Sequence, residues 1–261
     1  GIETTTGPLG QGISNAVGFA LAEEILKKRL GNKIINHKTY VLAGDGCLME
    51  GISHEALSLA GHLKLKNLIL LFDDNSISID GPTNLAVSDN HEKRFKSYGW
   101  NFLRTNGHNH KEIFKVLKKA QKSKKPTAIS CKTTIGFGSP NKSGKASAHG
   151  SPLGEDEIKL VRKKLKWKHE AFKIPNDLLT EWRKIGQNAS LKAKKHEAKN
   201  KKIFLKFQSI NSYEDLIKKS IDEYLKELTP LATRKSSEMF LNIISKMPNL
   251  IGGSADLAGI K

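Results

Sequence analysis

The sequence predicts an α/β fold in which helices flank a parallel sheet. Residues 39–43 and 68–72 are two apolar runs of strand length, and each is followed directly by polar residues. Between them, residues 54–63 carry apolar side chains at helical spacing. A strand, a helix and a second strand in this order form a right-handed βαβ unit. The carboxyl ends of both strands then meet at one edge of the sheet, where open α/β folds bind ligands.

The remaining elements follow in chain order. Residues 11–30 form a predicted helix with one apolar stripe, ended by a Gly-Asn pair. A helix over residues 110–123 and a strand over residues 127–133 complete the first region. Residues 75–90 and 136–154 are rich in Gly, Ser, Asn and Pro and are predicted to be loops.

The pattern divides the chain into three parts. Residues 1–155 are expected to form an α/β domain, and residues 156–229 a basic, mostly helical linker. Residues 230–261 are expected to begin a second α/β domain, with a helix over residues 236–246 and a short strand that ends at Gly252-Gly253.

Asp45 and Asn75 are the most informative pair in the chain, because each follows one of the two paired strands. A carboxylate and an amide oxygen side by side suit Mg²⁺, which takes few protein oxygens and completes its shell with substrate phosphates. Gly44 and Gly46 allow a sharp turn and leave room for a phosphate. A Gly-Asp-Gly turn alone is also common as a tight βα turn with a surface Asp. The second polar strand end favours a cation site.

The charge balance limits the classes of protein to which the sequence can belong. The 261 residues carry a formal net charge of +18, concentrated between residues 158 and 206. This balance allows nonspecific binding of polyanions, but the segment lacks an ordered pattern of aromatic and arginine side chains, so a solvated helical linker is favoured. The two cysteines, Cys47 and Cys131, do not make a disulfide framework and fit a cytoplasmic protein. No apolar run approaches the length of a membrane span.

Several motifs in one order resemble the transketolase family across nearly the whole chain. They are Glu3-Thr4-Thr5-Thr6-Gly7-Pro8-Leu9-Gly10-Gln11-Gly12, Gly44-Asp45-Gly46-Cys47, Glu50-Gly51-Ile52-Ser53, Asp73-Asp74-Asn75, Ile135-Gly136-Phe137-Gly138-Ser139, His149-Gly150, Ala232-Thr233-Arg234-Lys235 and Gly252-Gly253-Ser254-Ala255-Asp256-Leu257. The resemblance implies transfer of a two-carbon ketol unit between sugar phosphates in the pentose phosphate pathway. It also implies a homodimer, thiamine diphosphate and a divalent cation, which is Mg²⁺, Ca²⁺ or Mn²⁺.

The resemblance assigns the cofactor-binding residues one by one. Asp45 and Asn75 would hold the metal, with the backbone carbonyl of Ile77 as a third ligand. Gly46 and Asn75 would contact the diphosphate, and His149 would contact both cofactor and substrate. An imidazole that titrates near neutrality can also help to move protons there.

Other carried-over residues lie around this centre. Gly7, Pro8 and Leu9 would line the cofactor, just ahead of a helix whose free amides favour anions. The same resemblance places Glu50 and Glu55 at the dimer contact near the cofactor. Arg234 would bind the substrate phosphate through its planar fork of donors, and Asp256 would reach a cofactor site, across the dimer.

The resemblance also predicts that the chain is a fragment, inactive by itself. It begins after the first strands of the family and ends just inside the second domain. The early histidines, a phosphate-binding serine and the glutamate that activates the cofactor are expected outside these 261 residues. Two alternatives remain: a related thiamine diphosphate enzyme, such as dihydroxyacetone synthase or a split transketolase subunit, and a basic polyanion-binding module. Specific nucleic-acid binding and membrane association are not expected.

Overall fold

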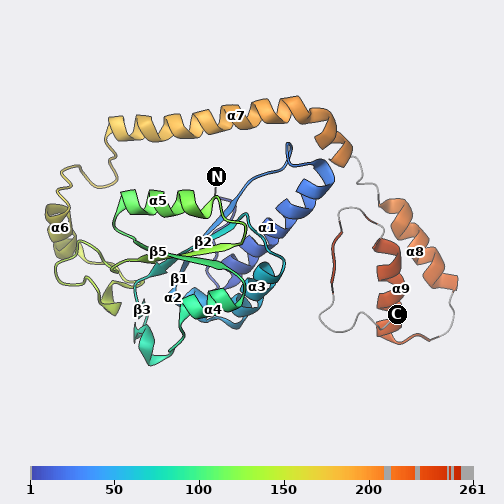
Figure 1. The fold of residues 1–261 in the computed structure, drawn as a ribbon, viewed down its shortest axis with the longest axis horizontal. Helices are drawn as coiled ribbons and strands as arrows, with labels where there is room; N and C mark the ends of the chain where they lie inside the picture. The colour runs from blue at the N-terminus through green and yellow to red at the C-terminus, as the bar shows by residue number, and fades with distance from the viewer. Residues whose placement is uncertain (1, 209–212, 227–229, 246, 248–249, 254–261) are drawn as a thin grey trace. The chain divides into compact units, whose positions relative to one another are not determined.

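The computed structural model describes residues 2–208, 213–226, 230–245, 247 and 250–253. The chain divides into two units, Gly1–Pro175 and Asn176–Lys261. The first unit contains the sheet and the helices that cover it, whereas the described residues of the second unit contain only helices (Figure 1).

A four-stranded parallel sheet forms the centre of the first unit. Its strands follow the spatial order β1 (Thr39–Gly44), β2 (Leu68–Asp74), β6 (Thr127–Lys132) and β5 (Asn101–Asn106). The register pairs Gly44 with Asp73 and Asp73 with Cys131, so the carboxyl ends of these strands share one edge of the sheet. The predicted parallel sheet is therefore confirmed, and its carboxyl edge places the polar residues that follow each strand close together.

Helices cover both faces of the sheet, which is the reason that its central strands are apolar throughout. Helices α1 (Gln11–Leu30) and α3 (Gly51–His62) pack on one face, against Leu68, Leu70 and Phe72. Helix α5 (His110–Ala120) packs on the other face, against Ile69 and Ile129. Alternate residues of β2 thus enter two separate cores, as the two-residue period of a strand requires.

The helix predicted between the first two strands differs from its expected bounds. A short helix α2 (Asp45–Met49) begins directly at the strand end, and α3 starts at Gly51 rather than at residue 54. The break at Glu50, whose backbone is extended, lets the chain turn before α3 packs on α1. Asp45 therefore lies at the start of a helix rather than in an open loop.

Two elements were not predicted. Helix α4 (His91–Ser97) and strand β5 lie between the loop 75–90 and α5. Strand β5 is polar at both ends and only partly buried, and its sequence has no continuous apolar run that would predict a strand.

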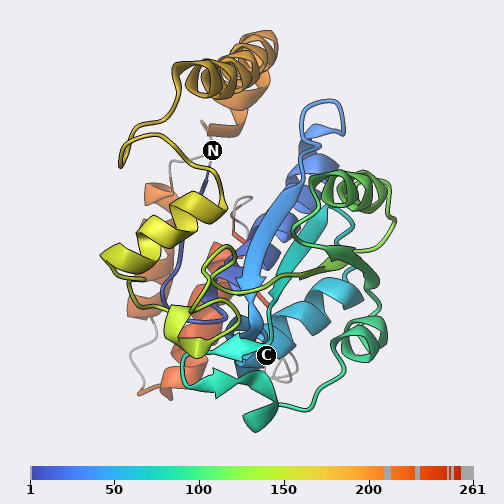
Figure 2. The ribbon, with the colours of Figure 1, turned by 90° about the vertical axis from the view of Figure 1, so that its left-hand side faces the viewer.

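The two predicted loops contain little regular structure, as expected. The first holds a small hairpin of β3 (Ile77–Ser78) and β4 (Gly81–Pro82) and the turn η1 (Thr83–Leu85). This hairpin lies beyond the carboxyl ends of β1 and β2 (Figure 2). The second loop holds only the turn η2 (Ala146–Ala148) before α6 (Glu155–Lys164).

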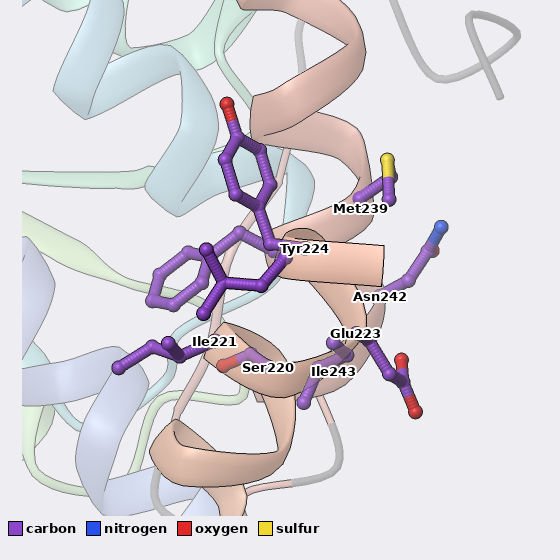
Figure 3. Close-up of a pocket in the computed structure, with 9 residues that line it drawn as sticks. Ser220, Ile221, Glu223, Tyr224, Met239, Asn242 and Ile243 are labelled. Atoms are coloured by element: carbon purple, nitrogen blue, oxygen red, sulfur yellow. The ribbon is translucent and has the colours of Figure 1, made fainter. Parts of the chain in front are cut away.

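The second unit begins with the long helix α7 (Asn176–Gln208). Helices α8 (Glu214–Lys226) and α9 (Thr233–Ile244) then pack together around a pocket of about 410 Å³. Its lining includes Tyr224 from α8 and Phe240 and Ile243 from α9 (Figure 3). The strand expected before Gly252-Gly253 lies partly outside the described residues and stays a prediction; the described residues 250–253 form no strand.

Two further expectations concern the whole chain. Both cysteines are free thiols, and no disulfide framework was expected from the sequence. Among the residues that the structure describes, no helix combines the length and apolar character that a bilayer crossing requires.

Gly61 is a position where close packing forbids a side chain. A Cβ added at Gly61 in α3 would lie 1.7 Å from the backbone carbonyl oxygen of Tyr98. We expect Gly61→Ala to lower the free energy of unfolding by at least ~1–3 kcal/mol through overpacking. Gly18→Ala is the matched control, because Gly18 is a helical glycine with no atom within 4 Å of an added Cβ. That change should be neutral or stabilising by up to ~1 kcal/mol. Urea denaturation of the two variants measures these changes. Equal changes in the free energy of unfolding would contradict the explanation by close packing.

Candidate metal and diphosphate site

The Asp45 carboxylate joins the ends of two neighbouring strands. Asp45 is only 6% exposed, and its Oδ2 accepts hydrogen bonds from two backbone N–H groups of the turn after β2. The donors are Asn75, with an N···O distance of 3.3 Å, and Ser76, at 3.2 Å. The structure thus brings Asp45 and Asn75 together, as the sequence predicts, and the contact is between a side chain and the opposing backbone.

The turn after β2 has a strained backbone that side chains of β6 hold in place. Ser76 has a φ of 63°, in the left-handed region that serine rarely adopts. The Lys132 ammonium donates to Ser76 Oγ at 2.9 Å and to Asp74 Oδ1 at 3.1 Å, and Ser130 Oγ donates to Asp74 Oδ2 at 2.8 Å. These contacts fix the turn that presents both amides to Asp45.

The turn after β2 carries oxygen atoms that keep free lone pairs. Asn75 Oδ1 accepts from the backbone N–H of Ile77 at 2.9 Å, which orients the amide and leaves a second lone pair on the oxygen. Ile77 lies opposite Pro82 in the β3–β4 hairpin as a non-hydrogen-bonded pair, because the ladder bond runs from the Thr83 N–H to the Ser76 carbonyl, so the Ile77 carbonyl is directed away from β4. A carboxylate, an amide oxygen and a backbone carbonyl form a donor set that suits a hard cation such as Mg²⁺.

The surroundings of Asp45 disfavour its charged form. Burial raises the pKa of the Asp45 carboxyl above its ordinary value, and the hydrogen bonds from Asn75 and Ser76 oppose that rise only in part. A divalent cation beside the carboxylate would favour the charged form. In the described part of the chain, no group of three or more His, Cys, Asp or Glu side chains could hold a metal ion. Any cation here would therefore depend on a mixed set of oxygen ligands.

The turn before α1 packs on the Asp45 turn. Gly7, Pro8 and Leu9 are exposed, and a Cβ added at Gly46 would lie 3.2 Å from Leu9 Cδ1. Gly10 has a φ of 79°, and a Cβ there would lie 2.7 Å from Ile52 Cγ2. Glycine is therefore required at position 10, whereas a side chain at position 46 would need Leu9 to shift; both turns lie in the first unit.

His149 follows the η2 turn and is half-buried. Its Nδ1 is a buried polar atom with no hydrogen-bond partner among the described residues. Leaving such an atom unpaired costs about 1–3 kcal/mol, so a ligand that pairs with it would recover that energy. This unpaired nitrogen and the oxygen set around Asp45 both fit a bound polar cofactor.

Glu50 and Glu55 are both exposed, on and beside the first turn of α3. Glu50 is the N-cap residue of α3, but its side chain makes no capping hydrogen bond. In the described structure, neither carboxylate forms an ion pair within the first unit. Both side chains are therefore available to a partner.

Two predicted residues lie elsewhere. Arg234 is an exposed residue in the first turn of α9, in the second unit. Asp256 lies outside the described residues. The roles proposed for both remain predictions.

The sequence analysis missed Lys132 and Ser76. Their contact depends on the left-handed turn and on the pairing of β2 with β6, neither of which leaves a residue pattern in the sequence. The only indication in the sequence was that the predicted strand 127–133 ends in polar residues, which could contact the polar residues Asp73-Asp74 at the end of another strand.

Comparison with known proteins gives a consistent result. Residues 1–223 match the family model described as transketolase, thiamine diphosphate binding domain. A transketolase of Rhodobacter capsulatus is 44% identical over 99% of this chain and 40% of its own length. A transketolase 2 of Escherichia coli is 46% identical over 99% of this chain and 41% of its own length.

Solved structures agree in fold. A transketolase of Campylobacter jejuni matches with a TM-score of 0.84 and 40% identity, over 99% of this chain and 41% of that chain. A Pichia stipitis transketolase in complex with sedoheptulose-7-phosphate matches with a TM-score of 0.79 and 38% identity, over 99% and 41% of the two chains. This chain spans about two fifths of the length of the relatives it matches. On these matches, the chain belongs to the transketolase family, and residues 1–223 correspond to its thiamine diphosphate binding domain.

Proposed function

We propose that this chain is the metal- and diphosphate-binding part of a transketolase. The whole enzyme would transfer a two-carbon ketol unit from a ketose phosphate to an aldose phosphate, with thiamine diphosphate and Mg²⁺, Ca²⁺ or Mn²⁺. One observation carries the proposal: the buried Asp45 carboxylate meets the turn of the neighbouring strand at the ligand-binding edge of the sheet.

The protein groups at this edge would bind and orient the cofactor. Asp45, Asn75 and the carbonyl of Ile77 would hold the cation, which offsets the charge of a diphosphate. Gly46 gives the phosphates room, and the turn of Gly7, Pro8 and Leu9 lies beside it. Thiamine diphosphate, when bound, supplies the nucleophilic carbon that carries the two-carbon unit.

His149 would act on the cofactor and the substrate. Its buried Nδ1 has no partner among the described residues, so it can donate to or accept from a bound oxygen. An imidazole in this place can orient a phosphate or a sugar hydroxyl and can hold a proton during transfer.

A second copy of the chain and a phosphorylated sugar are the proposed partners. Glu50 and Glu55 are exposed without ion pairs in the described structure, and Ile52 and Leu59 of the same helix are also exposed, so this face suits a dimer contact. Asp256 would reach a cofactor across that dimer. The free thiols of Cys47 and Cys131 support a cytoplasmic location.

Asp45→Asn tests the cation site directly. The amide keeps the volume and an acceptor for the two backbone N–H groups but removes the charge. We expect the affinity for thiamine diphosphate in the presence of Mg²⁺ to fall by at least about a hundredfold, since even side chains that only orient a metal ligand contribute 10- to 100-fold. Calorimetric titration measures it. Asp80→Asn, an exposed aspartate beside the β3–β4 turn, is the control and should bind normally. Equal affinities for both variants would refute the site.

Arg234→Ala tests the substrate phosphate contact in the full-length enzyme. A charge-assisted contact contributes ~1.5–3 kcal/mol, so kcat/KM for a sugar phosphate should fall about ten- to hundredfold. The unphosphorylated sugar should be unaffected. Lys235→Ala is the control, because Lys235 is the adjacent cation and pairs with Glu238 at 3.2 Å. Parallel losses on phosphorylated and unphosphorylated substrates would rule out a phosphate role for Arg234.

The 261 residues assayed alone should show no ketol transfer. They span about two fifths of the length of related transketolases, so part of the catalytic site is expected outside them. Release of a two-carbon unit from a ketose phosphate is measured with added Mg²⁺ and thiamine diphosphate, beside a full-length transketolase. Turnover close to that of the full-length enzyme would contradict the proposal that this chain supplies only the metal- and diphosphate-binding part of the enzyme.

A further inference from the structure

Ordering the loop between β6 and α6 costs an unusually large amount of conformational entropy. It contains or adjoins several glycines in the left-handed region, whose freedom in the unfolded chain is large. They are Gly136, Gly138, Gly144, Gly150 and Gly154. Such a loop holds one conformation only if specific contacts fix it, and His149 lies near its end.

Glu157 provides the strongest of these contacts. It lies in the first turn of α6, is 8% exposed, and accepts three hydrogen bonds, all from the loop. The donors are the Ser139 hydroxyl, the backbone N–H of Asn141 at 2.9 Å and the Asn141 side-chain amide at 2.8 Å. Glu155 and Asp156 in the same turn are exposed, so Glu157 alone among these acids is directed to the loop.

A chain of backbone contacts extends from this carboxylate to His149. Ser139 Oγ also accepts from the backbone N–H of Lys142 at 3.0 Å, and the Lys142 carbonyl accepts from Lys145 at 3.2 Å. The Lys145 carbonyl accepts from Ala148 at 3.0 Å. A Cβ added at Gly136 would lie 2.9 Å from Ala148 Cβ, so the residue before His149 packs directly on the start of the loop.

The start of the loop has an anchor of its own. The backbone N–H of Thr134 donates to His108 Nε2 at 2.9 Å, and the Phe137 ring stacks on His108 with centroids 4.0 Å apart. Loss of the Glu157 contacts should therefore free residues 139–149 and leave residues 133–137 in place.

We propose that Glu157 is the positioning residue of His149: it holds the loop so that the imidazole is presented in one place. The inference rests on the proposed function only in that His149 is taken to face the cofactor. Glu157 does not touch that site itself, and it acts through Ser139, Asn141 and the backbone that follows them.

The charge of Glu157 is constant under ordinary conditions. The hydrogen bond from Ser139, followed by those from Asn141, lowers the pKa of the Glu157 carboxyl from 4.5 to about 2. The carboxylate therefore stays ionised at neutral pH, and the loop is held permanently rather than by a pH switch.

The test compares Glu157→Gln with Glu155→Gln in the 261-residue chain. The two substitutions are chemically identical and lie in the same turn, but only the first changes a buried, hydrogen-bonded carboxylate. Mass spectrometry measures backbone deuterium uptake by segment and the slow exchange of the His149 C2 proton, whose pH dependence gives the pKa of that ring. Calorimetry gives the affinity for thiamine diphosphate with Mg²⁺.

In Glu157→Gln we expect the rate of backbone deuterium uptake over residues 139–149 to rise about tenfold or more, because hydrogen bonds to a charged group are lost. Uptake over residues 133–137 and in α5 should stay unchanged, while the His149 C2 exchange shifts. Cofactor affinity should fall about 10- to 100-fold, as for other residues that orient a ligand. Glu155→Gln should behave like the unmodified chain.

Unchanged uptake over residues 139–149, or unchanged His149 exchange in a freed loop, would overturn the proposal. If Glu157→Gln loses protection in α5 as well, Ser139→Ala replaces it as the milder variant, with the same expected pattern. If the loop and His149 respond as expected but no form of the chain binds thiamine diphosphate with Mg²⁺, the positioning stands and the proposed function fails.

Discussion

The contact between the Asp45 carboxylate and two backbone amides is the interaction on which the site depends. It ties the end of β1 to the turn after β2, and it places a buried negative charge where two strand ends meet. Two amide donors offset only part of the cost of burying that charge, and the raised pKa of the carboxyl reflects the remainder. A cation ligated there would supply the missing compensation. The packing of the first unit holds this arrangement in place.

The rest of the first unit makes that contact possible. Apolar residues on both faces of β2 are buried under helices, so the strand cannot slide without exposing one core or the other. The register with β6 then places Lys132 beside Asp74 and Ser76, where it stabilises a left-handed turn. Glu157 performs a comparable task at the second loop. Two exposed loops are thus held by charged side chains that are not themselves proposed ligands.

The parts that could be predicted from sequence depend on short-range patterns. The helix 11–30 and the strands β1 and β2 were predicted because their apolar spacing is regular, and Asp45 and Asn75 followed from the strand ends. Strand β5 was missed because it is polar at both ends and has no continuous apolar run. Lys132 and Glu157 were missed because their partners are distant in sequence or depend on loop geometry.

The central claim is that Asp45 and the turn of Asn75 bind a cation that also binds a diphosphate. Electron–nuclear double resonance on the chain loaded with Mn²⁺ and thiamine diphosphate tests it most directly. The account predicts a ³¹P coupling of the size expected for a phosphate oxygen bound directly to the metal, together with fewer water protons than aqueous Mn²⁺ has. A Mn²⁺ ion that keeps its full water shell, with no ³¹P coupling, would contradict the account.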